Sequence, residues 1–333
     1  MSFIEEIKNR AKQQIKTIIL PEATDIRILK AAQIVNKEKY AKVALIGNKE
    51  EIERLIKENN LELGDTQIID PAKSEETSEY AKELYELRKA KGMTEEQAQK
   101  LILEPIYYGM MMVKLNHADG LVSGAAHSTA DTLRPALQIL KTAPGTKLVS
   151  AFFVMVVPNC EYGANGTFIF ADSGLNEEPD ADKLSEIAIS SSKSFKQLVG
   201  EEPKVAMLSY STYGSAHSAS TEKVVEATRL AKEKAPELLI DGELQLDAAI
   251  IPEVAEFKAK GSPLKGEANV LVFPDLGAGN IGYKLTQRLA KAEAYGPLCQ
   301  GIARPVNDLS RGCSSEDVAG VVAITAVQAQ SQG

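Results

Sequence analysis

The sequence lacks most of the short motifs that mark common types of catalytic site. It contains no G-x-x-x-x-G-K-[ST], which argues against a P-loop kinase, and no G-x-S-x-G, so an α/β-hydrolase would lack its nucleophile elbow. The histidines are His117, His127 and His217, and none is at the H-x-x-x-H spacing of a zinc site. The sequence therefore implies no catalytic metal.

Cysteine and long apolar runs are scarce as well. The three cysteines, Cys160, Cys299 and Cys313, are far apart and form no C-x-x-C, which excludes a disulfide framework and favours a reducing compartment. The longest apolar run, residues 148–157, is too short to span a bilayer, and the N-terminus has no signal-peptide core. We therefore expect a cytoplasmic protein with no membrane partner.

The charge balance narrows the possible ligands. The 333 residues carry a net charge of −8, which argues against general binding of nucleic acid. An acidic average does not exclude anionic ligands, because a local group of arginines can bind them. At roughly 150 residues per domain, the length suggests two domains.

In the first part of the chain, short apolar runs alternate with helical patterns. We expect helices at 3–15, after Asp25, around 52–56, across most of 75–114 and at 130–140, with strands at 17–20, 43–46, 67–70 and 118–122. Thr94 and Gln97 have capping-box spacing. This alternation predicts a mostly parallel sheet covered on both faces, and a first domain of about 1–145.

A second α/β domain is predicted at 146–300. Asn165-Gly166 is a turn signal between apolar runs at 154–157 and 167–170, which predicts an antiparallel pair. Further strands are expected at 204–208 and 269–273, and helices at 181–198, 220–234 and 281–293. A last helix at 315–329 is expected to pack on the first domain, which would then comprise 1–145 plus 301–333.

The stretch from Ala303 to Asp317 combines several groups that bind anions. Ser310, Arg311 and Gly312 precede the expected start of the last helix. The free N–H groups and the positive dipole end at a helix start favour a bound anion. This loop is the leading candidate site.

Three other loops follow expected strands. Residues 123–134 include Ser128, Thr129 and Arg134, read either as ligand-binding groups or as a turn and helix cap. Residues 273–283 contain a G-x-G-x-x-G and Asn280, but the acidic residue expected after a second strand is missing, and Glu293 is expected within a helix. We interpret these glycines as a backbone-approach or anion site. In residues 171–176, Asp172 and Asn176 are interpreted either as groups that line a cleft or as a cap and turn, and the residues alone favour the cap and turn.

Taken together, these motifs resemble the phosphate acetyltransferase (phosphotransacetylase) family, in its short form. The resemblance covers the whole length and rests on residues 123–134, 171–176, 273–284 and 304–312. It implies reversible transfer of an acetyl group between acetyl phosphate and coenzyme A, a role in acetate metabolism, and no permanently bound cofactor. It also implies an isocitrate dehydrogenase-like fold, with two three-layer α/β domains and a cleft between them, and commonly a homodimer.

The resemblance also implies roles for individual residues. Ser310, Arg311 and Asp317 correspond to catalytic positions, and Arg88 and Arg134 to positions that bind coenzyme A or phosphate groups. Ser128, Thr129 and Asn280 are further substrate-binding candidates. Coenzyme A, acetyl phosphate and inorganic phosphate are then the expected partners.

A direct mechanism suits these residues. Asp317 would take the thiol proton, Ser310 or a backbone N–H would stabilise the oxyanion, and Arg311 would hold the acyl phosphate. Both substrates would react in one ternary complex. Asp317 also has S-x-x-D spacing from Ser314, so its alternative role is a helix cap. Cys160 offers a rival covalent route, although no partner base adjoins it.

Two alternative activities remain open at this point. Phosphate butyryltransferase shares the chemistry and differs in the size of its acyl pocket. An NAD(P)-dependent isocitrate-type dehydrogenase is suggested by the G-x-G-x-x-G, but it would need a cluster of metal-binding aspartates that the sequence does not show.

Overall fold

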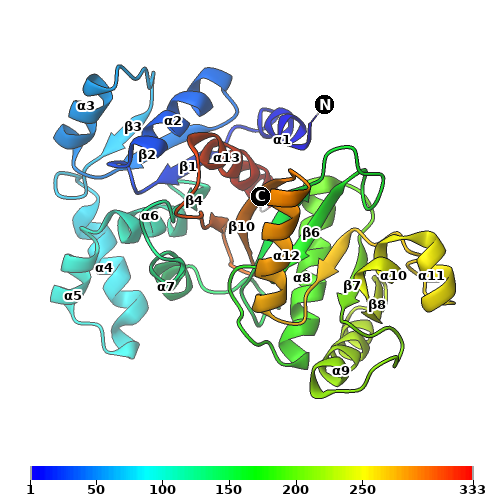
Figure 1. Cartoon of the computed structure of the whole chain (residues 1–333). Helices are drawn as coiled ribbons and strands as arrows, with labels where there is room; N and C mark the ends of the chain where they lie inside the picture. Colours follow the sequence, from blue (N-terminus) through cyan, green and yellow to red (C-terminus); the bar gives the residue numbers. More distant parts are fainter. Residues whose placement is uncertain (1, 332–333) are drawn as a thin grey trace. The chain divides into compact units, whose positions relative to one another are not determined.

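The structure is a computed structural model that describes residues 2–331, and the chain divides into two compact units. The first unit comprises the described residues of Met1–Pro144 and Ile302–Gly333, and the second comprises Gly145–Gly301. Each unit has its own sheet with helices packed on it (Figure 1). The mixed α/β fold expected from the alternating pattern is confirmed.

The first unit is built on a sheet whose paired strands are all parallel. Its order is β11 (Val306–Asn307), β4 (Gly120–Val122), β1 (Thr17–Leu20), β2 (Lys42–Ile46) and β3 (Gln67–Ile69). Ile18, Ile19 and Leu20 of β1 are fully buried. A strand covered on both faces needs a continuous apolar run, which is why β1 was predicted with its observed bounds.

Helices connect these strands and cover the sheet. They are α1 (Phe3–Ala11), α2 (Ile26–Glu38), α3 (Lys49–Glu58), α4 (Thr77–Arg88), a 3-10 turn (Lys89–Lys91), α5 (Glu95–Leu101), α6 (Pro105–Lys114), α7 (Thr129–Ile139) and α13 (Ser315–Gln330). The expected caps are present, with Asp25 at the start of α2 and the Thr94–Gln97 capping box at α5.

The last helix lies deep in this unit. From Val318 to Ala329 every residue of α13 is buried, because the helix packs against β1 and β4 and contacts α1 and α2. A helix that is apolar on all sides is stable only when it is enclosed. The C-terminal helix therefore belongs to the core of the first unit, although the whole second unit lies between it and the earlier part of the first unit in the chain.

The second unit has a mixed sheet of order β10 (Glu293–Gln300), β5 (Ser150–Val156), β6 (Thr167–Ala171), β9 (Val270–Val272), β7 (Lys204–Leu208) and β8 (Leu239–Leu244). Strands β5 and β6 are antiparallel, as Asn165-Gly166 predicted. Both turn residues have positive φ, and Thr167 N–H donates to the Ala164 carbonyl at 3.0 Å. Asn and Gly tolerate that conformation best.

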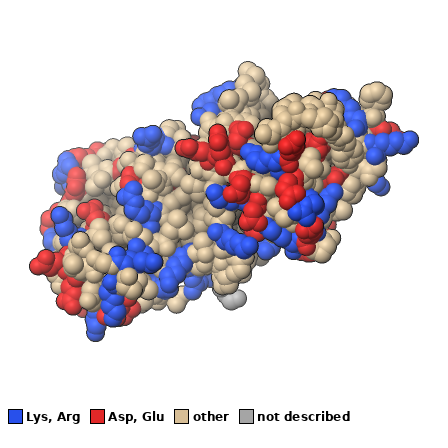
Figure 2. All heavy atoms as spheres, turned by 90° about the horizontal axis from the view of Figure 1, so that it is seen from below, with Lys and Arg blue, Asp and Glu red and all other residues tan. Residues whose placement is uncertain are grey.

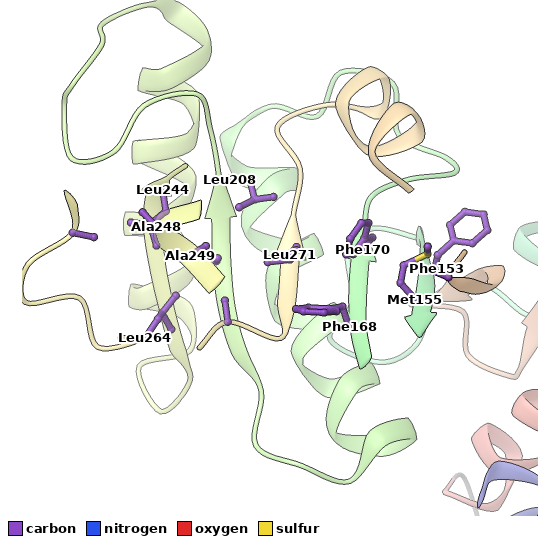
Figure 3. Packing of buried hydrophobic residues seen from close by; sticks show 14 residues of the cluster. Phe153, Met155, Phe168, Phe170, Leu208, Leu244, Ala248, Ala249, Leu264 and Leu271 are labelled. Atoms are coloured by element: carbon purple, nitrogen blue, oxygen red, sulfur yellow. The ribbon is translucent and has the colours of Figure 1, made fainter. Parts of the chain in front are cut away.

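The helices of the second unit are α8 (Ala181–Val199), α9 (Ala219–Lys234), α10 (Leu246–Ile250), α11 (Pro252–Lys258) and α12 (Leu276–Leu289). One face of the sheet carries a buried core (Figure 3) that includes Phe153, Phe168, Phe170 and Leu271. Tyr283 of α12 stacks on Phe153 with ring centroids 4.0 Å apart, which fixes that helix on the core.

Some expected boundaries were wrong. Helix α12 begins at Leu276 and ends at Leu289, so the expected span of 281–293 started too late and ended too late. Glu293 is the first residue of β10 and does not lie in a helix. Strands β8, β10 and β11 were not foreseen. The helix expected at 3–15 ends at Ala11, and Thr129 is already the first residue of α7.

Candidate active site

Three loops of the first unit meet at one edge of its sheet. They follow β1, β4 and β11, which are parallel and whose register makes them neighbours. The carboxyl ends of parallel strands lie at the same edge, where ligands of open α/β sheets bind. The β4 loop is residues 123–128, and the β11 loop is residues 308–314, so the topology brings the two leading sequence motifs together.

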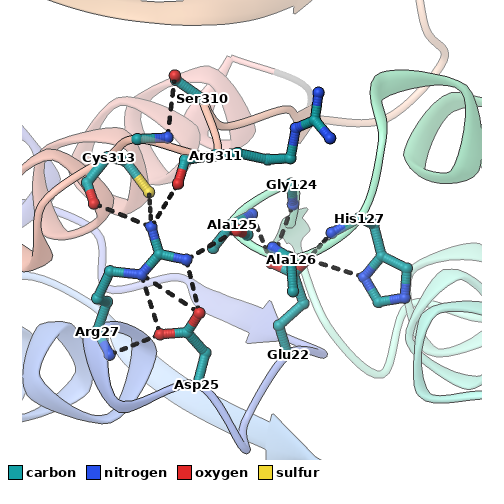
Figure 4. Close-up of polar contacts among 11 residues, drawn as sticks. Glu22, Asp25, Arg27, Gly124, Ala125, Ala126, His127, Ser310, Arg311 and Cys313 are labelled. Atoms are coloured by element: carbon teal, nitrogen blue, oxygen red, sulfur yellow. Dashed lines mark hydrogen bonds and ion pairs between the residues drawn. The ribbon is translucent and has the colours of Figure 1, made fainter.

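A buried carboxylate organises the β4 loop. Glu22 is 5% exposed and accepts hydrogen bonds from the N–H groups of Gly124 and Ala125 at 2.9 Å, and of Ala126 and His127 at 2.8 Å. The His127 Nδ1 lies 2.8 Å from the same carboxylate (Figure 4). These four N–H groups are therefore occupied by the protein itself and do not form an anion site for a substrate.

The β11 loop contains a tight turn. The Cys313 N–H donates to the Ser310 carbonyl at 2.9 Å, and the Gly312 N–H donates to Ser310 Oγ at 3.3 Å. Ser310 and Arg311 are exposed. No hydrogen bond or ion pair within the described residues involves the Arg311 guanidinium, so its donors remain open to an anion.

Arg27 of α2 contacts both loops (Figure 4). Its Nη1 donates to the carbonyl oxygens of Arg311 at 2.7 Å and Cys313 at 3.2 Å, and its Nη2 donates to the Ala125 carbonyl at 2.8 Å. Asp25 lies 2.6 Å from Nη2 and accepts from Nε at 3.0 Å. This hydrogen bonding to Arg27 lowers the pKa of Asp25, so the pair is ionised at neutral pH.

Asp317 is a helix cap in the structure. Its Oδ2 accepts the Ser314 N–H at 2.9 Å, and its own N–H donates to Ser314 Oγ at 3.0 Å, which completes a capping box at the start of α13. The side chain is exposed. Among the described residues its Oδ1 accepts no hydrogen bond, so one carboxylate oxygen remains free for chemistry.

Asp308, the first residue of the β11 loop, is hydrogen-bonded to the first residue of α7. It is 1% exposed, and its Oδ2 accepts from the Thr129 hydroxyl at 2.6 Å. Its Oδ1 has no hydrogen-bond partner within the described part of the chain. Burial raises the pKa of Asp308 to about 6. The neighbouring Ser128 caps α7, since its Oγ accepts the Asp131 N–H at 3.2 Å and donates to that carboxylate at 2.6 Å.

The two remaining candidate arginines, Arg88 and Arg134, both act electrostatically on Tyr107. Burial raises the pKa of Tyr107, and the positive charges of Arg134 and Arg88 act in the opposite direction, so both guanidiniums are within electrostatic range of this ring. Arg134 is exposed, with its side chain 3.6 Å from Asp131. Arg88 has a buried Nε with no partner among the described residues.

The three glycines of the G-x-G-x-x-G are Gly277, Gly279 and Gly282, and the space around them is limited at Gly279 and Gly282. They lie in the first turns of α12, after the N-cap Asp275. A Cβ at Gly279 would lie 2.4 Å from the Asp172 carbonyl oxygen, and one at Gly282 would lie 2.9 Å from the Phe273 ring. They let α12 approach the sheet closely, so the backbone-approach interpretation holds. Asn280 is half-buried on the same helix, and its side-chain amide makes no hydrogen bond to another described residue.

Two further candidates of the second unit, Asp172 and Cys160, lie in or against its packed interior. Asp172 is 2% exposed and accepts the N–H groups of Gly174, Leu175 and Asn176, the cap-and-turn arrangement expected for this loop. Cys160 is half-buried and packs against the core.

The described residues hold no group of three His, Cys, Asp or Glu side chains arranged to bind a metal ion. No helix between residues 2 and 331 has the length and apolarity to cross a bilayer. Acidic and basic side chains are interspersed on the face shown in Figure 2, where no area of one sign dominates.

Sequence reasoning missed Glu22, Arg27 and Asp308. Glu22 and Asp308 lie within two residues of the end of a buried strand, and a charged residue at that place was the available signal, whereas Arg27 lies in the first turn of α2. The β4 and β11 loop residues that Glu22 and Arg27 contact are 98 to 286 positions away, and Asp308 contacts Thr129 at 179 positions. Only the tertiary structure reveals such contacts.

Several known proteins are similar to this chain in sequence and in fold. A family model described as phosphate acetyl/butaryl transferase matches residues 2–326. A phosphate acetyltransferase of Acetivibrio thermocellus is 69% identical over 330 residues, 99% of this chain and 99% of that protein. A solved phosphotransacetylase from Streptococcus pyogenes has a TM-score of 0.92 at 42% identity, covering 99% of this chain and all of the other. One from Staphylococcus aureus has a TM-score of 0.89 at 47% identity, covering 98% and 99%.

Proposed function

Because the chain belongs to the phosphate acetyl/butaryl transferase family, we propose that it transfers an acetyl group between acetyl phosphate and coenzyme A. The observation that carries the proposal is the convergence of a hydroxyl, an unpaired guanidinium and a carboxylate at the start of α13. Ser310, Arg311 and Asp317 lie there within eight residues, on exposed backbone. These are the groups that an acyl phosphate and an attacking thiol require.

The acyl phosphate is held by Arg311. Its guanidinium is committed to no other described side chain, and a guanidinium binds phosphate oxygens through two parallel hydrogen bonds. Ser310 Oγ accepts the Gly312 N–H at 3.3 Å, so its own hydroxyl hydrogen is available to donate to the oxyanion that develops on the acyl oxygen.

Asp317 takes the thiol proton through its free Oδ1 while Oδ2 keeps the cap. A free thiol has a pKa near 8.5, so only a minor fraction is ionised at neutral pH, and a positioned base accelerates such a step by about 10²–10⁴-fold. The sulfur then attacks the acyl carbon, phosphate leaves, and no acyl-enzyme forms. Cys160 has no part in this route, because it packs against the buried core of its own unit.

Coenzyme A binds through Arg88 and Arg134. Its phosphate groups are anionic, and the positive charges of both guanidiniums act on the half-buried Tyr107. Ser128, Thr129 and Asn280 remain substrate-binding candidates. Of these Asn280 is the least committed, because the hydroxyls of Ser128 and Thr129 already donate to carboxylates of the protein.

The acyl group is acetyl rather than butyryl, in line with the name of the relatives that are 69% and 58% identical. A dehydrogenase is not favoured, since Gly279 and Gly282 of the G-x-G-x-x-G serve to pack α12. We also propose a cytoplasmic homodimer. Ile281, Leu285 and Leu289 form an apolar stripe on α12 that is 61%, 52% and 80% exposed, and a second copy would cover it.

One assay tests the activity. The protein is mixed with acetyl phosphate and coenzyme A, and thioester absorbance is followed, with butyryl phosphate and NAD reduction as comparisons. We expect thioester formation with acetyl phosphate, and arsenate-sensitive loss of acetyl-CoA in reverse. Faster turnover of butyryl phosphate would reverse the acyl assignment, and absence of thioester from either substrate would refute the proposal.

A further inference from the structure

Arg27 occupies the point where the three loops of the first unit meet. Its side chain starts on α2, directly after the β1 loop, and reaches the β4 loop at Ala125 and the β11 loop at Arg311 and Cys313. These bonds span 98 to 286 positions of sequence. No other described side chain donates to backbone carbonyls of both the β4 and β11 loops.

The geometry of a guanidinium explains why an arginine stands here. Three nitrogens in one plane present five N–H groups in fixed directions. One edge, Nε and Nη2, faces Asp25, while Nη1 and the second side of Nη2 face the loops. Asp25 is itself held, because it caps α2 by accepting the Arg27 N–H at 2.8 Å. The guanidinium is thus oriented before it contacts either loop.

The contacted atoms determine how the Ser310 turn sits. Arg27 binds the carbonyl of Arg311 and the carbonyl of Cys313, both within or at the end of that turn. With these carbonyls drawn toward Arg27, the Arg311 side chain extends away from it (Figure 4). Ser310, Arg311 and Gly312 are exposed, and within the described residues the hydrogen bonds recorded from outside the turn to its carbonyls come from Arg27, so these bonds orient its backbone.

We infer that Arg27 is a positioning residue that aligns Ser310 and Arg311 for the acyl phosphate. It touches no substrate and acts through the backbone of the turn. The inference rests on the proposed roles of Ser310 and Arg311. A reacting group displaced by about 1 Å loses about 10²-fold in rate, which sets the size of the expected effect.

The test compares Arg27→Ala, Arg27→Lys and a control, Arg54→Ala. Arg54 is an exposed arginine of α3 that pairs with Glu58 of the same helix at 3.0 Å, so its removal tests the loss of an arginine that does not bind the loops. For Arg27→Ala we expect kcat to fall by about 10–10²-fold and the KM for acetyl phosphate to rise, with the KM for coenzyme A unchanged within about twofold. A merely structural role would change both KM values or neither.

Two readouts separate positioning from misfolding. Added guanidinium ion is expected to restore part of the kcat of Arg27→Ala and to leave Arg54→Ala unchanged. Arg27→Lys is expected to remain impaired, because one ammonium does not reach all three carbonyls while pairing with Asp25. Near-normal kinetics of Arg27→Ala, or a loss that follows its unfolded fraction and resists rescue, would overturn the inference.

Arg311→Ala separates this inference from the proposed function. If Arg311→Ala keeps normal turnover, the acyl-phosphate site is misplaced and the role of Arg27 falls with it. If Arg311→Ala is inactive while Arg27→Ala is normal, only the role of Arg27 is refuted.

Discussion

Asp317 Oδ2 accepts the backbone N–H of Ser314 at 2.9 Å, while Ser314 Oγ accepts the N–H of Asp317 at 3.0 Å. The residue proposed as the base is therefore also half of a capping box. The two roles are compatible, because a carboxylate has two oxygens and the cap uses only one. They are also separable by mutation.

Asp317→Asn keeps an oxygen for the Ser314 N–H and removes the base. We expect kcat to fall by about 10²–10⁴-fold with little change in either KM. The matched variant Ser314→Ala keeps the carboxylate and loses the cap, so it should cost about 1 kcal/mol of stability and less activity. Steady-state kinetics and thermal unfolding decide the matter, and near-normal turnover of Asp317→Asn would remove Asp317 as the base.

Gly312 is a glycine that the folded chain itself does not require. A Cβ there would meet only Ser310 Oγ, at 3.8 Å, and its φ is not positive. We expect the space to be used by the acyl phosphate. Gly312→Ala should therefore leave the melting temperature within about 2 °C, a shift corresponding to less than about 1 kcal/mol, and lower kcat/KM for acetyl phosphate. Unchanged kcat/KM would show that the substrate does not approach this backbone.

Glu22→Gln tests the buried carboxylate under the β4 loop. Its two oxygens accept four N–H groups, and an amide replaces one oxygen with a donor that faces donors. We expect a loss of at least about 2 kcal/mol in the free energy of unfolding, since orphaned buried N–H groups cost about 1–3 kcal/mol each. Glu53→Gln on exposed α3 is the control and should change stability by less than about 0.5 kcal/mol. Equal effects of the two variants would contradict the role of Glu22.

Asp308 should make stability depend on pH in an unusual direction. Its pKa is about 6 in the folded protein, against 3.8 for an unperturbed aspartate, so the folded protein binds more protons than the unfolded chain between these values. Its contribution to stability is then fully present below about pH 4 and declines as pH rises through 6, by on the order of 2–3 kcal/mol.

Asp308→Asn should remove that decline while keeping an oxygen for the Thr129 hydroxyl. Denaturant unfolding of the parent and the variant at about pH 4.5, 5.5, 6.5 and 7.5 measures the difference between their free energies of unfolding. If the free energies of unfolding of parent and variant change with pH in parallel, Asp308 is ionised in the folded protein at all four pH values.

Gly279 and Gly277 form a matched pair on α12. A Cβ at Gly279 meets the Asp172 carbonyl oxygen at 2.4 Å, whereas one at Gly277 meets only the Asp275 carboxylate, at 3.1 Å. Gly279→Ala should destabilise by about 1–3 kcal/mol through overpacking. Gly277→Ala should change stability by less than about 1 kcal/mol, because helix propensity favours alanine. A larger loss for Gly277→Ala would show that the glycines do not serve close packing.

The sequence by itself determined most of the elements and the family. Apolar runs predicted β1, β5, β6 and β7, since buried strands need continuous apolar residues, and Asn165-Gly166 predicted the antiparallel pair because few residues accept its dihedral angles. The loops carrying Ser310, Arg311 and Ser128 were found because hydroxyls, arginine and glycine cluster there. A feature can be predicted from the sequence when the residues that cause it are close together in the chain.

The tertiary structure decided what those loops do. Glu22 accepts the N–H groups of the β4 loop, and Arg27 joins this loop to the Ser310 turn. Both contacts depend on strands β1, β4 and β11 being neighbours, although these strands lie far apart in the chain. The same holds for Gly279, whose need for space comes from the carbonyl of Asp172. Contacts between distant segments arise from packing, and no local pattern records them.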